Sequence, residues 1–381
     1  MTAAIWVAGA FCIVTSLVHF VSIALVTLRG RFAGKNSPSA AGPLPVVSIL
    51  RPVCGIENAI ERTLRSGFEL DYPEYELVFC VASETDPVIP LVRRLMAEYS
   101  GVPARILIGD DRISINPKLN NLVKGWQAAE HDWVVMADSN VLMPPDYLTR
   151  MLDRWSPSTG LVCSPPLGSE PDGAFAEFEC AFLNTFQARW QLAADAVGNG
   201  FAQGKTMFWR RENLDRNGGI EALAADPAED AAATKVIRGS GLDVRLVYLP
   251  FPQPLGHRSL RAVWHRQLRW ARLRRVTFPI FFCMEFFVGG MFPILSAAFL
   301  SANDVIPIWS AAALAVFWYG MEALMAKGLD WHCSWKSPLA WILRDVSLPL
   351  LWINAVSGNG FEWRGNQMNV KEDSLMVVEA D

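Results

Sequence analysis

The sequence predicts an α/β domain with a mostly parallel β-sheet, flanked at both ends of the chain by apolar segments of bilayer length. Three observations support this fold class. Short apolar runs alternate with segments of helical spacing between residues 46 and 137, as in β-α-β units. Long apolar stretches occupy residues 3–28 and much of the chain after residue 275. The 381 residues are also 51% hydrophobic and only 19% charged, which is more apolar than most soluble proteins.

Net charge and cysteine usage exclude some classes of function. The formal net charge of -4 argues against nucleic acid as the main partner. The chain has 7 cysteines but no C-x-x-C pair. We therefore expect reduced, mostly buried thiols, and neither a zinc site nor a disulfide framework.

Residues 1–28 are predicted to form a transmembrane signal anchor. The apolar segment Ala3–Leu28 is long enough, because about 20 residues cross a bilayer core. Basic residues follow it, beginning with Arg29 and Arg31, and none precedes it, which places its carboxyl side in the cytoplasm. The alternative is a cleaved signal peptide, although no A-x-A-like site ends the segment. Residues 29–45 are predicted to form a flexible linker.

The main folded domain is predicted to cover residues 46–257. Its first strands are predicted at Val46–Leu50, Tyr75–Val81, Arg105–Ile108 and Trp133–Ala137, with helices at Asn58–Phe68 and Lys118–Ala129. Ligands of parallel sheets bind at the carboxyl ends of the strands. Asp86 lies a few residues after one predicted strand and Asp138 directly after another. Both are therefore candidate site residues.

Asp138 is the candidate metal ligand. It begins the segment Asp138-Ser-Asn140. Mg²⁺ and Mn²⁺ take oxygen ligands, and they bind diphosphates through one or two protein carboxylates together with substrate oxygens. Asn140 could add an amide oxygen but no charge. The alternative is an ordinary turn, because Asp, Ser and Asn are all turn-forming residues.

Asp230 is the candidate general base. It ends the motif Ala228-Glu-Asp230 and precedes a helix-compatible segment, Ala231–Ile237. A carboxylate here could remove the proton of an attacking hydroxyl group. The alternative role is to cap the amino end of the predicted helix.

The basic run at residues 258–275 is predicted to form an amphipathic helix at the membrane–water interface. It carries seven arginines and two tryptophans and leads directly into an apolar stretch. Arg266 and Arg269 are three residues apart and share one helix face, where guanidinium groups suit a departing diphosphate. Trp270 is expected to stack on a ligand or to anchor the helix at the interface.

The other residues of this run have simpler expected roles. Trp264 and Leu268 are four residues apart and are predicted to form an apolar stripe that docks the helix. The outer arginines are expected to act as lipid-surface and topology charges. They are Arg258, Arg261, Arg274 and Arg275.

Residues 276–357 are predicted to be a membrane region with two or three spans, followed by a polar tail at residues 358–381. The apolar stretches lie at residues 276–301, 305–326 and 338–357. The first two are candidate spans. The third carries Arg344 and Asp345 near its middle, and such a pair at membrane depth usually faces protein or water. This third stretch is therefore expected either to span or to re-enter the membrane.

Two motifs are expected to carry no chemistry. Gly198–Thr206 approaches a phosphate-binding P-loop, but the first glycine of that pattern would fall at Asn199, and no long soluble NTPase core follows. Gly239-Ser-Gly241 lacks the flanks of a nucleophile elbow, so a plain turn is expected there.

The order of these motifs resembles that of ceramide glucosyltransferases, glycosyltransferase family 21, which is related to the larger family 2. The resemblance runs from about Val46 to Arg275 and extends into the apolar tail. The segments that carry it are Ile49-Leu-Arg-Pro52, Glu69-Leu-Asp-Tyr-Pro-Glu-Tyr-Glu76, Cys80-Val81 with Asp86-Pro87, Ile115-Asn-Pro-Lys-Leu-Asn-Asn-Leu122, Asp138-Ser139, Ala228-Glu-Asp230 and Arg266-Gln-Leu-Arg-Trp270. Three aspartates followed by R-x-x-R-W are specific as a set, although each motif is short.

The resemblance implies an A-type (GT-A) nucleotide-diphospho-sugar transferase fold. It implies an inverting transfer of glucose from UDP-glucose, or a related UDP-sugar, to the primary hydroxyl of ceramide, giving glucosylceramide. The implied cofactor is a divalent cation, Mg²⁺ or Mn²⁺. The implied location is the membrane, with the catalytic domain on the cytoplasmic side, and we expect a bacterial inner membrane.

The resemblance also implies roles for eight residues. They are Asp86 and Lys118 at the nucleotide sugar; Asp138 at the metal and diphosphate; Asp230 as the general base; Arg266, Arg269 and Trp270 at the diphosphate and the reacting end; and Gln187, which stands where relatives place a histidine, with Trp270 in the acceptor region.

Three alternatives remain open from the sequence. One keeps the reaction and moves an N-acetylhexosamine or hexose to a hopanoid or other membrane lipid. A second is a processive polysaccharide synthase, which shares the three acids and a (Q/R)-x-x-R-W motif. The third is a scaffold without enzymatic activity that binds anionic lipid through the arginine run.

Overall fold

The computed structural model describes residues 3–32, 43–363 and 366–369, which form two compact units. Within these residues, the sheet unit comprises the chain from residue 32 to 167 and from 194 to 256. The helical unit comprises residues up to 31, then 168–193 and 257–369. The predicted linker at 29–45 and polar tail at 358–381 lie partly outside the described residues.

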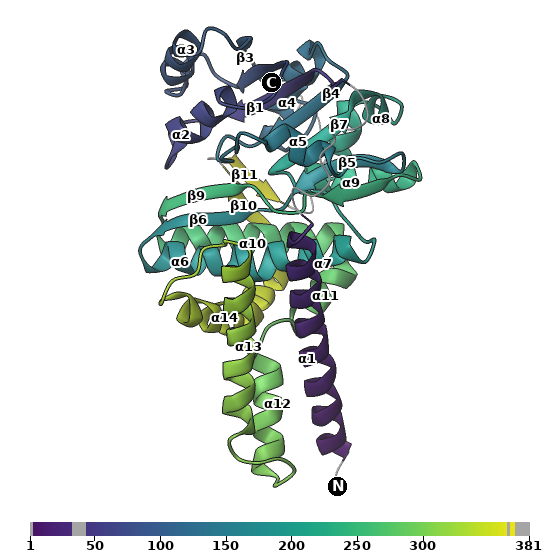
Figure 1. The fold of residues 1–381 in the computed structure, drawn as a ribbon, viewed down its shortest axis with the longest axis vertical. Coiled ribbons are helices and arrows are strands. Elements are labelled where there is room, and N and C mark those ends of the chain that lie inside the picture. The colour runs from purple at the N-terminus through teal and green to yellow at the C-terminus, as the bar shows by residue number, and fades with distance from the viewer. Residues whose placement is uncertain (1–2, 33–42, 364–365, 370–381) are drawn as a thin grey trace. The chain divides into compact units, whose positions relative to one another are not determined.

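The sheet unit is built around a seven-stranded sheet with the order β3-β2-β1-β4-β7-β5-β8 (Figure 1). Its strands are β1 (Val47–Val53), β2 (Tyr75–Val81), β3 (Ala104–Ile108), β4 (Trp133–Ala137), β5 (Thr159–Ser164), β7 (Thr206–Arg210) and β8 (Asp243–Leu246). Strand β1 is parallel to β2 and β4, β2 to β3, and β5 to β8. Strand β7 is antiparallel to both of its neighbours. The predicted mostly parallel sheet is confirmed.

The strand predictions hold best where the sheet is most buried. Strands β2 and β4 begin and end at the predicted residues, and every residue of β2 is buried. Such continuous apolar runs are typical of parallel strands that are covered on both faces. Strand β1 continues beyond its predicted end, to Val53. Ile49, Leu77 and Val135 belong to the large buried cluster at the centre of this unit.

Helices of the sheet unit follow the predicted alternation. They are α2 (Ile60–Arg65) with the 3-10 helix η2 (Ser66–Phe68), α3 (Ile89–Glu98), α4 (Pro117–Ala128), α5 (Tyr147–Leu152), α8 (Arg211–Asp215), the 3-10 helix η4 (Ile220–Ala225) and α9 (Glu229–Gly239). The parallel register pairs Val53 with Val81 and Leu50 with Met136. The carboxyl ends of β1, β2 and β4 therefore lie at the same edge of the sheet.

The predicted domain at residues 46–257 needs one correction. Residues 168–193 lie within this range but belong to the helical unit. The chain leaves the sheet unit within β6 (Leu167–Asp172) and finally passes back to the helical unit within β9 (Pro252–His257). The sequence gives no linker signal there, because the crossings occur inside regular elements.

The helical unit contains the remaining helices and one short hairpin. They are α1 (Ala3–Gly30), α6 (Ala174–Ala181), the π-helix η3 (Phe182–Ala188), most of α7 (Arg189–Ala196), α10 (Leu260–Thr277), α11 (Pro279–Glu285), α12 (Met291–Ala302), α13 (Ser310–Gly328), α14 (Ser337–Ser357) and the antiparallel strands β10 (Gly360–Trp363) and β11 (Asn366–Asn369). Helices α1, α12 and α13 lie side by side (Figure 1).

By length and composition, two described helices could cross a membrane: α1 and α14. The expected span at 276–301 is instead broken into α11 and α12, with Gly289 at a φ of 106° between them. The stretch at 338–357 lies within one unbroken helix, α14.

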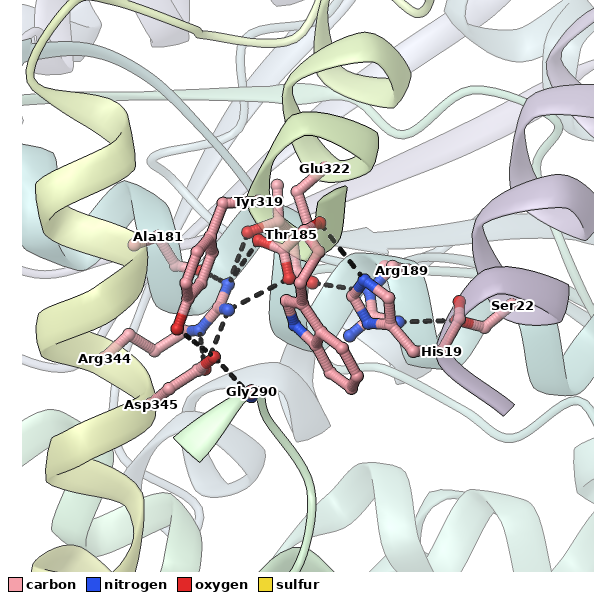
Figure 2. Close-up of polar contacts among 11 residues, drawn as sticks. His19, Ser22, Ala181, Thr185, Arg189, Gly290, Tyr319, Glu322, Arg344 and Asp345 are labelled. Atoms are coloured by element: carbon pink, nitrogen blue, oxygen red, sulfur yellow. Dashed lines mark hydrogen bonds and ion pairs between the residues drawn. The ribbon is translucent and has the colours of Figure 1, made fainter. Parts of the chain in front are cut away.

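A buried cluster of charges connects several helices of this unit (Figure 2). Arg344 Nη2 lies 3.0 Å from Glu322 Oε1 and 2.8 Å from Asp345 Oδ1. Arg344 Nη1 also donates a 2.5 Å hydrogen bond to Thr185 Oγ1 of the π-helix. The expectation that Arg344 and Asp345 face protein is confirmed, because both are almost completely buried.

Candidate functional site

Asp138 lies at the carboxyl end of β4, where two lysines meet its carboxylate. Lys118 Nζ lies 2.7 Å from Asp138 Oδ1, and Lys205 Nζ lies 2.9 Å from Asp138 Oδ2. Lys205 Nζ also donates to Asn140 Oδ1 at 3.3 Å. Burial raises the pKa of Asp138, but the two ammonium groups outweigh burial and hold this pKa well below its ordinary value. The carboxylate is therefore ionised at neutral pH.

Lys118 is fixed from three sides. It lies in the first turn of α4, and the side chain of Asn116 caps that helix by accepting from the backbone N–H of Lys118. Lys118 Nζ lies 2.8 Å from Glu229 Oε1 and also donates to the carbonyl of Gly204. Glu229 Oε2 in turn accepts a 2.7 Å hydrogen bond from Asn116 Nδ2. Together with Asp138, these acceptors use all three N–H groups of the ammonium.

The segment that approaches a P-loop supplies part of this site. Thr206 begins strand β7 and not a helix, so the segment is not a P-loop, as expected. Its Gly204 nevertheless donates its backbone N–H to Asp230 Oδ2 at 3.0 Å, and its Lys205 bonds to Asp138. A Cβ at Gly204 would lie 2.6 Å from Glu229 Oε1, so only glycine fits without displacement.

Sequence reasoning missed Lys205 and Glu229. The sequence contains a signal for each of them. Lys205 follows a glycine in the P-loop-like segment Gly198–Thr206, and Glu229 directly precedes the candidate base Asp230. Neither signal identifies a partner, because Lys205 is 67 residues from Asp138 and Glu229 is 113 residues from Asn116. Only the folded sheet brings these residues together.

Asp230 lies in the first turn of α9. Its Oδ1 accepts a 2.8 Å hydrogen bond from the backbone N–H of Ala231, and its Oδ2 accepts from Gly204. Ala228 occupies the N-cap position, so Asp230 is not the N-cap residue of α9. Burial and the adjacent charge of Glu229 raise the pKa of Asp230 to about 6.

Asp86 follows β2 at the same edge of the sheet. Both of its carboxylate oxygens lie 3.0 Å from the backbone nitrogen of Gly55, which follows β1. Asp86 Oδ1 also accepts a 2.9 Å hydrogen bond from the backbone N–H of Val88. Asp86 therefore holds together the loops that follow β1 and β2.

The remaining predicted residues belong to the helical unit. Arg266, Arg269 and Trp270 lie on α10, which agrees closely with the predicted basic helix, and Gln187 lies on the π-helix η3. Trp264 and Leu268 pack against a buried aromatic cluster that includes Phe178 and Phe182. The predicted apolar docking stripe is therefore confirmed.

Arg266 is held by the buried Glu179 of α6. Arg266 Nη1 bonds to Glu179 Oε1, and Arg258 Nε lies 3.2 Å from Glu179 Oε2. Three of the four outer arginines, Arg258, Arg274 and Arg275, also bond to protein. Arg274 pairs with Glu285 of α11 at 2.5 Å, and Arg275 donates to the carbonyl of Ala355 at 2.6 Å.

Gln187 forms a buried amide pair with a residue of the basic helix. Gln187 Nε2 donates a 2.9 Å hydrogen bond to Gln267 Oε1. The other two polar atoms of the pair, Gln187 Oε1 and Gln267 Nε2, are buried without a hydrogen-bond partner. One amide oxygen and one amide nitrogen of this pair are therefore without a hydrogen-bond partner. Such groups cost free energy unless a water or a ligand satisfies them.

The donor chemistry at Asp138 suits a divalent cation that shares its ligands with a diphosphate. Asp138 and Asn140 offer oxygen atoms, the ligand type that Mg²⁺ and Mn²⁺ prefer. Among the described residues, no group of three or more His, Cys, Asp or Glu side chains could hold a metal by itself. Substrate oxygens and water would have to complete the coordination. Both oxygens of Asp138 also bond to ammonium groups, whose positive charges oppose the binding of a cation there.

Comparison with known proteins agrees with the resemblance seen in the motifs. The chain matches glycosyl transferase family 21 over residues 13–376. A ceramide glucosyltransferase of Komagataella phaffii is 39% identical over 459 aligned residues, which cover 94% of this chain and 90% of the relative. Ceramide glucosyltransferase 3 of Caenorhabditis elegans is 26% identical over 366 residues, covering 93% of this chain and 78% of the relative.

One solved structure shares the fold over most of the chain. It is the mannosyltransferase PcManGT from Pyrobaculum calidifontis in complex with GDP-Man and Mn²⁺. It is 21% identical and has a TM-score of 0.50, and the likeness covers 92% of this chain and 98% of that chain. The expected GT-A fold is confirmed by this likeness.

Proposed function

The chain belongs to glycosyl transferase family 21, and from that premise we propose that it transfers glucose from UDP-glucose to the primary hydroxyl of ceramide. The observation that carries this proposal is Asp230, a partly buried carboxylate with a raised pKa beside the Lys118–Asp138 pair. The names of the two relatives support the choice of ceramide as acceptor and glucose as the transferred sugar.

In this proposal Asp230 is the general base of a single displacement. Its carboxylate takes the proton of the ceramide hydroxyl while the hydroxyl oxygen attacks the anomeric carbon. The bond from that carbon to the diphosphate oxygen breaks in the same step, so the configuration inverts and UDP leaves. The products are glucosylceramide, UDP and the proton held on Asp230. A pKa of about 6 suits this role, because the group is mostly ionised at pH 7 yet basic enough to accept a proton.

The donor is proposed to bind at the carboxyl edge of the sheet. Asp86 and Lys118 are assigned to the nucleotide sugar and Asp138 to its diphosphate and metal. Arg266 and Arg269 are assigned to the departing diphosphate, since guanidinium groups match phosphate oxygens in bidentate geometry. A divalent cation at Asp138, when bound, would neutralise charge that develops on the leaving group.

The acceptor is proposed to bind the helical unit near Gln187 and Trp270. The buried Gln187–Gln267 pair has one amide oxygen and one amide nitrogen without a partner, and these atoms match the amide and hydroxyl groups of a ceramide head. The adjoining aromatic cluster around Phe182 offers an apolar environment for the neighbouring hydrocarbon. A lipid acceptor also agrees with α1 and α14, which among the described helices have the length and composition to span a membrane. The basic residues after α1 favour a cytoplasmic site.

One assay tests the function directly. The purified full chain is incubated in detergent or vesicles with a panel of UDP-sugars and a panel of lipids, and the products are identified by mass spectrometry. We expect one hexose per ceramide, formed from UDP-glucose. An N-acetylhexosamine on a polycyclic lipid, a ladder of saccharides, or no transfer to any lipid would each overturn the proposal in favour of an alternative.

Two variants sharpen that assay. Asp230→Asn should lower the transfer rate by about 10²- to 10⁴-fold, the usual contribution of a general base, with UDP binding retained. Asp243→Asn is the matched control, because it removes a carboxylate from the same unit at a half-exposed position paired with Arg245. Full turnover by Asp230→Asn would remove this residue from the role of base.

A further inference from the structure

Lys205 places an ammonium group on the edge of the candidate site. Its Nζ contacts Asp138 Oδ2 at 2.9 Å and Asn140 Oδ1 at 3.3 Å. It comes from the loop before β7, and its side chain is about as shielded as that of Asp138, at 14% and 21% exposed. Neither the family motifs nor the predicted site residues include this lysine.

The two lysines at Asp138 are held differently. Lys118 is anchored by Asp138, by Glu229 and by the carbonyl of Gly204, so moving it would leave the buried carboxylate of Glu229 without its cation. The contacts of Lys205 with Asp138 and Asn140 both lie at the end of β4. A small movement of the Lys205 side chain therefore leaves the Lys118–Glu229 pair intact.

The four charged groups that form ion pairs around Asp138 and Lys118 balance one another. Asp138 and Glu229 contribute two negative charges, and Lys118 and Lys205 contribute two positive charges. A divalent cation arriving alone would face two ammonium groups within bonding distance of its carboxylate ligand. A diphosphate arriving alone would face two carboxylates. Each charge is better accommodated when the other is present.

We propose that Lys205 exchanges partners when the donor binds, leaving Asp138 for the diphosphate oxygens of the nucleotide sugar. This inference rests on the proposed function, which supplies the diphosphate. Lys205 thereby neutralises Asp138 in the free protein and neutralises phosphate in the complex. The exchange frees one oxygen of Asp138 for a divalent cation.

The exchange makes donor binding and cation binding cooperative. The diphosphate attracts Lys205 away from Asp138 and so improves the cation site, and by linkage the cation improves diphosphate binding by the same factor. Couplings of this kind are typically about 5- to 150-fold in affinity. Without Lys205, the cation has one competitor fewer at Asp138 and the diphosphate has one partner fewer.

The test measures binding and not turnover. Mn²⁺ binding to the full chain is followed by the electron paramagnetic resonance signal of free Mn²⁺, with and without inorganic pyrophosphate. Lys205→Met removes the charge at similar length. We expect this variant to bind Mn²⁺ alone at least about fivefold more tightly, to bind pyrophosphate more weakly, and to lose most of the coupling between them. Unchanged or weaker Mn²⁺ binding, or an intact coupling, overturns the exchange.

Two further variants separate charge from structure. Lys235→Met is the matched control, because it removes a lysine paired with Asp226 in the same unit and should change neither binding constant. Lys205→Arg keeps the charge and should keep the coupling. A Lys205→Arg protein that loses coupling as fully as Lys205→Met overturns the proposal, since charge is then not the relevant property.

The outcome is distinguishable from failure of the proposed function. A chain that couples pyrophosphate to Mn²⁺ through Lys205 but glucosylates no ceramide refutes the acceptor or sugar assignment and leaves this inference standing. A chain that makes glucosylceramide but shows no dependence of the coupling on Lys205 refutes this inference alone.

Discussion

Asp230 differs from Asp138 in the direction of its pKa shift, although both carboxylates lie close to Gly204 and Lys118. At Asp138 two ammonium groups outweigh burial, whereas at Asp230 burial and the charge of Glu229 raise the pKa to about 6. The same site thus holds one carboxylate that stays ionised under all ordinary conditions and one that can accept a proton near neutral pH. The two opposite pKa shifts suit Asp138 as a group that binds cations and Asp230 as a neighbouring general base.

The raised pKa of Asp230 predicts how transfer depends on pH. The base must be ionised to accept a proton, so the rate should rise with pH and reach half of its plateau near pH 6. The measurement is kcat/KM for UDP-glucose and ceramide between pH 4.5 and 8.5, with circular dichroism at each pH as the control for folding. A profile without a rise between pH 5 and 7 would contradict the assignment.

A substitution at Gly204 tests whether activity requires the close packing of Gly204 against Lys118 and Glu229. In Gly204→Ala the new Cβ would lie 2.6 Å from Glu229 Oε1 and 3.1 Å from Lys118 Nζ, so that ion pair must shift. Because such displacements disturb catalytic geometry, we expect transfer to fall about 10²-fold with the fold retained. Gly239→Ala is the matched control, since a Cβ at this position would meet nothing within 4 Å and its φ is not positive. Equal activity of the two variants would contradict the expected crowding.

At the scale of elements, burial determines which strands can be predicted from the sequence. Strands β2 and β4 were predictable to the residue, because a covered parallel strand is a continuous apolar run with turn residues at its ends. Strand β7 was not, because it follows the P-loop-like segment and runs antiparallel between β4 and β5. Lys205 directly precedes this strand and was missed for the same reason. Asp138 and Asp230 were predictable from their positions beside regular elements, whereas their partners depend on the fold.

Helix α14 shows the same limit in the helical unit. In the sequence, two charged residues near the middle of this stretch argue against a simple membrane span. In the structure the stretch is a single helix, and its buried Arg344 forms ion pairs with Glu322 and Asp345 (Figure 2). The sequence shows that charged residues are present in this stretch. It does not show that Arg344 pairs with Glu322, which lies on α13. These buried charges are tolerated because Arg344, Glu322 and Asp345 neutralise and hydrogen-bond one another.

Removing one member of that cluster should be costly. Arg344→Met would leave the carboxylates of Glu322 and Asp345 buried without their cation, which typically costs about 3–5 kcal/mol. We expect a lower thermal midpoint of the detergent-solubilised protein, with partial recovery in the double variant Arg344→Met, Glu322→Gln, because less charge is then stranded. Lys327→Met, at an exposed position on the same α13, is the control. A destabilisation as small as that of the control would show that the cluster contributes little.

At the scale of the whole molecule, neither unit is a continuous stretch of chain. The helical unit is assembled from the amino-terminal helix, from residues 168–193 and from residues 257–369. A linear division of the sequence into anchor, domain and membrane region could not anticipate this, because charge and apolarity reveal segments but not their partners. The contacts of α1 show the consequence most directly. Its buried Ser22 and His19 are part of the same cluster as Arg189 (Figure 2).

These contacts predict that α1 is more than a membrane anchor. Arg189 Nη1 donates a 2.5 Å hydrogen bond to Ser22 Oγ, and the ring of His19 stacks on Trp318 at 3.6 Å. Replacing residues 3–28 with an unrelated apolar helix of equal length would preserve insertion but leave Arg189 without this acceptor, a loss of about 1–3 kcal/mol or more for a charged group. We therefore expect the exchanged protein to melt at lower temperature, and reintroducing only His19 and Ser22 should recover part of the loss. Thermal melting and the transfer of glucose to ceramide are measured in the same vesicles for the wild-type protein, the exchanged protein and the exchanged protein with His19 and Ser22 restored. An exchanged helix with wild-type stability and activity would reduce α1 to an anchor, whereas recovery by two residues would identify it as a structural part of the helical unit.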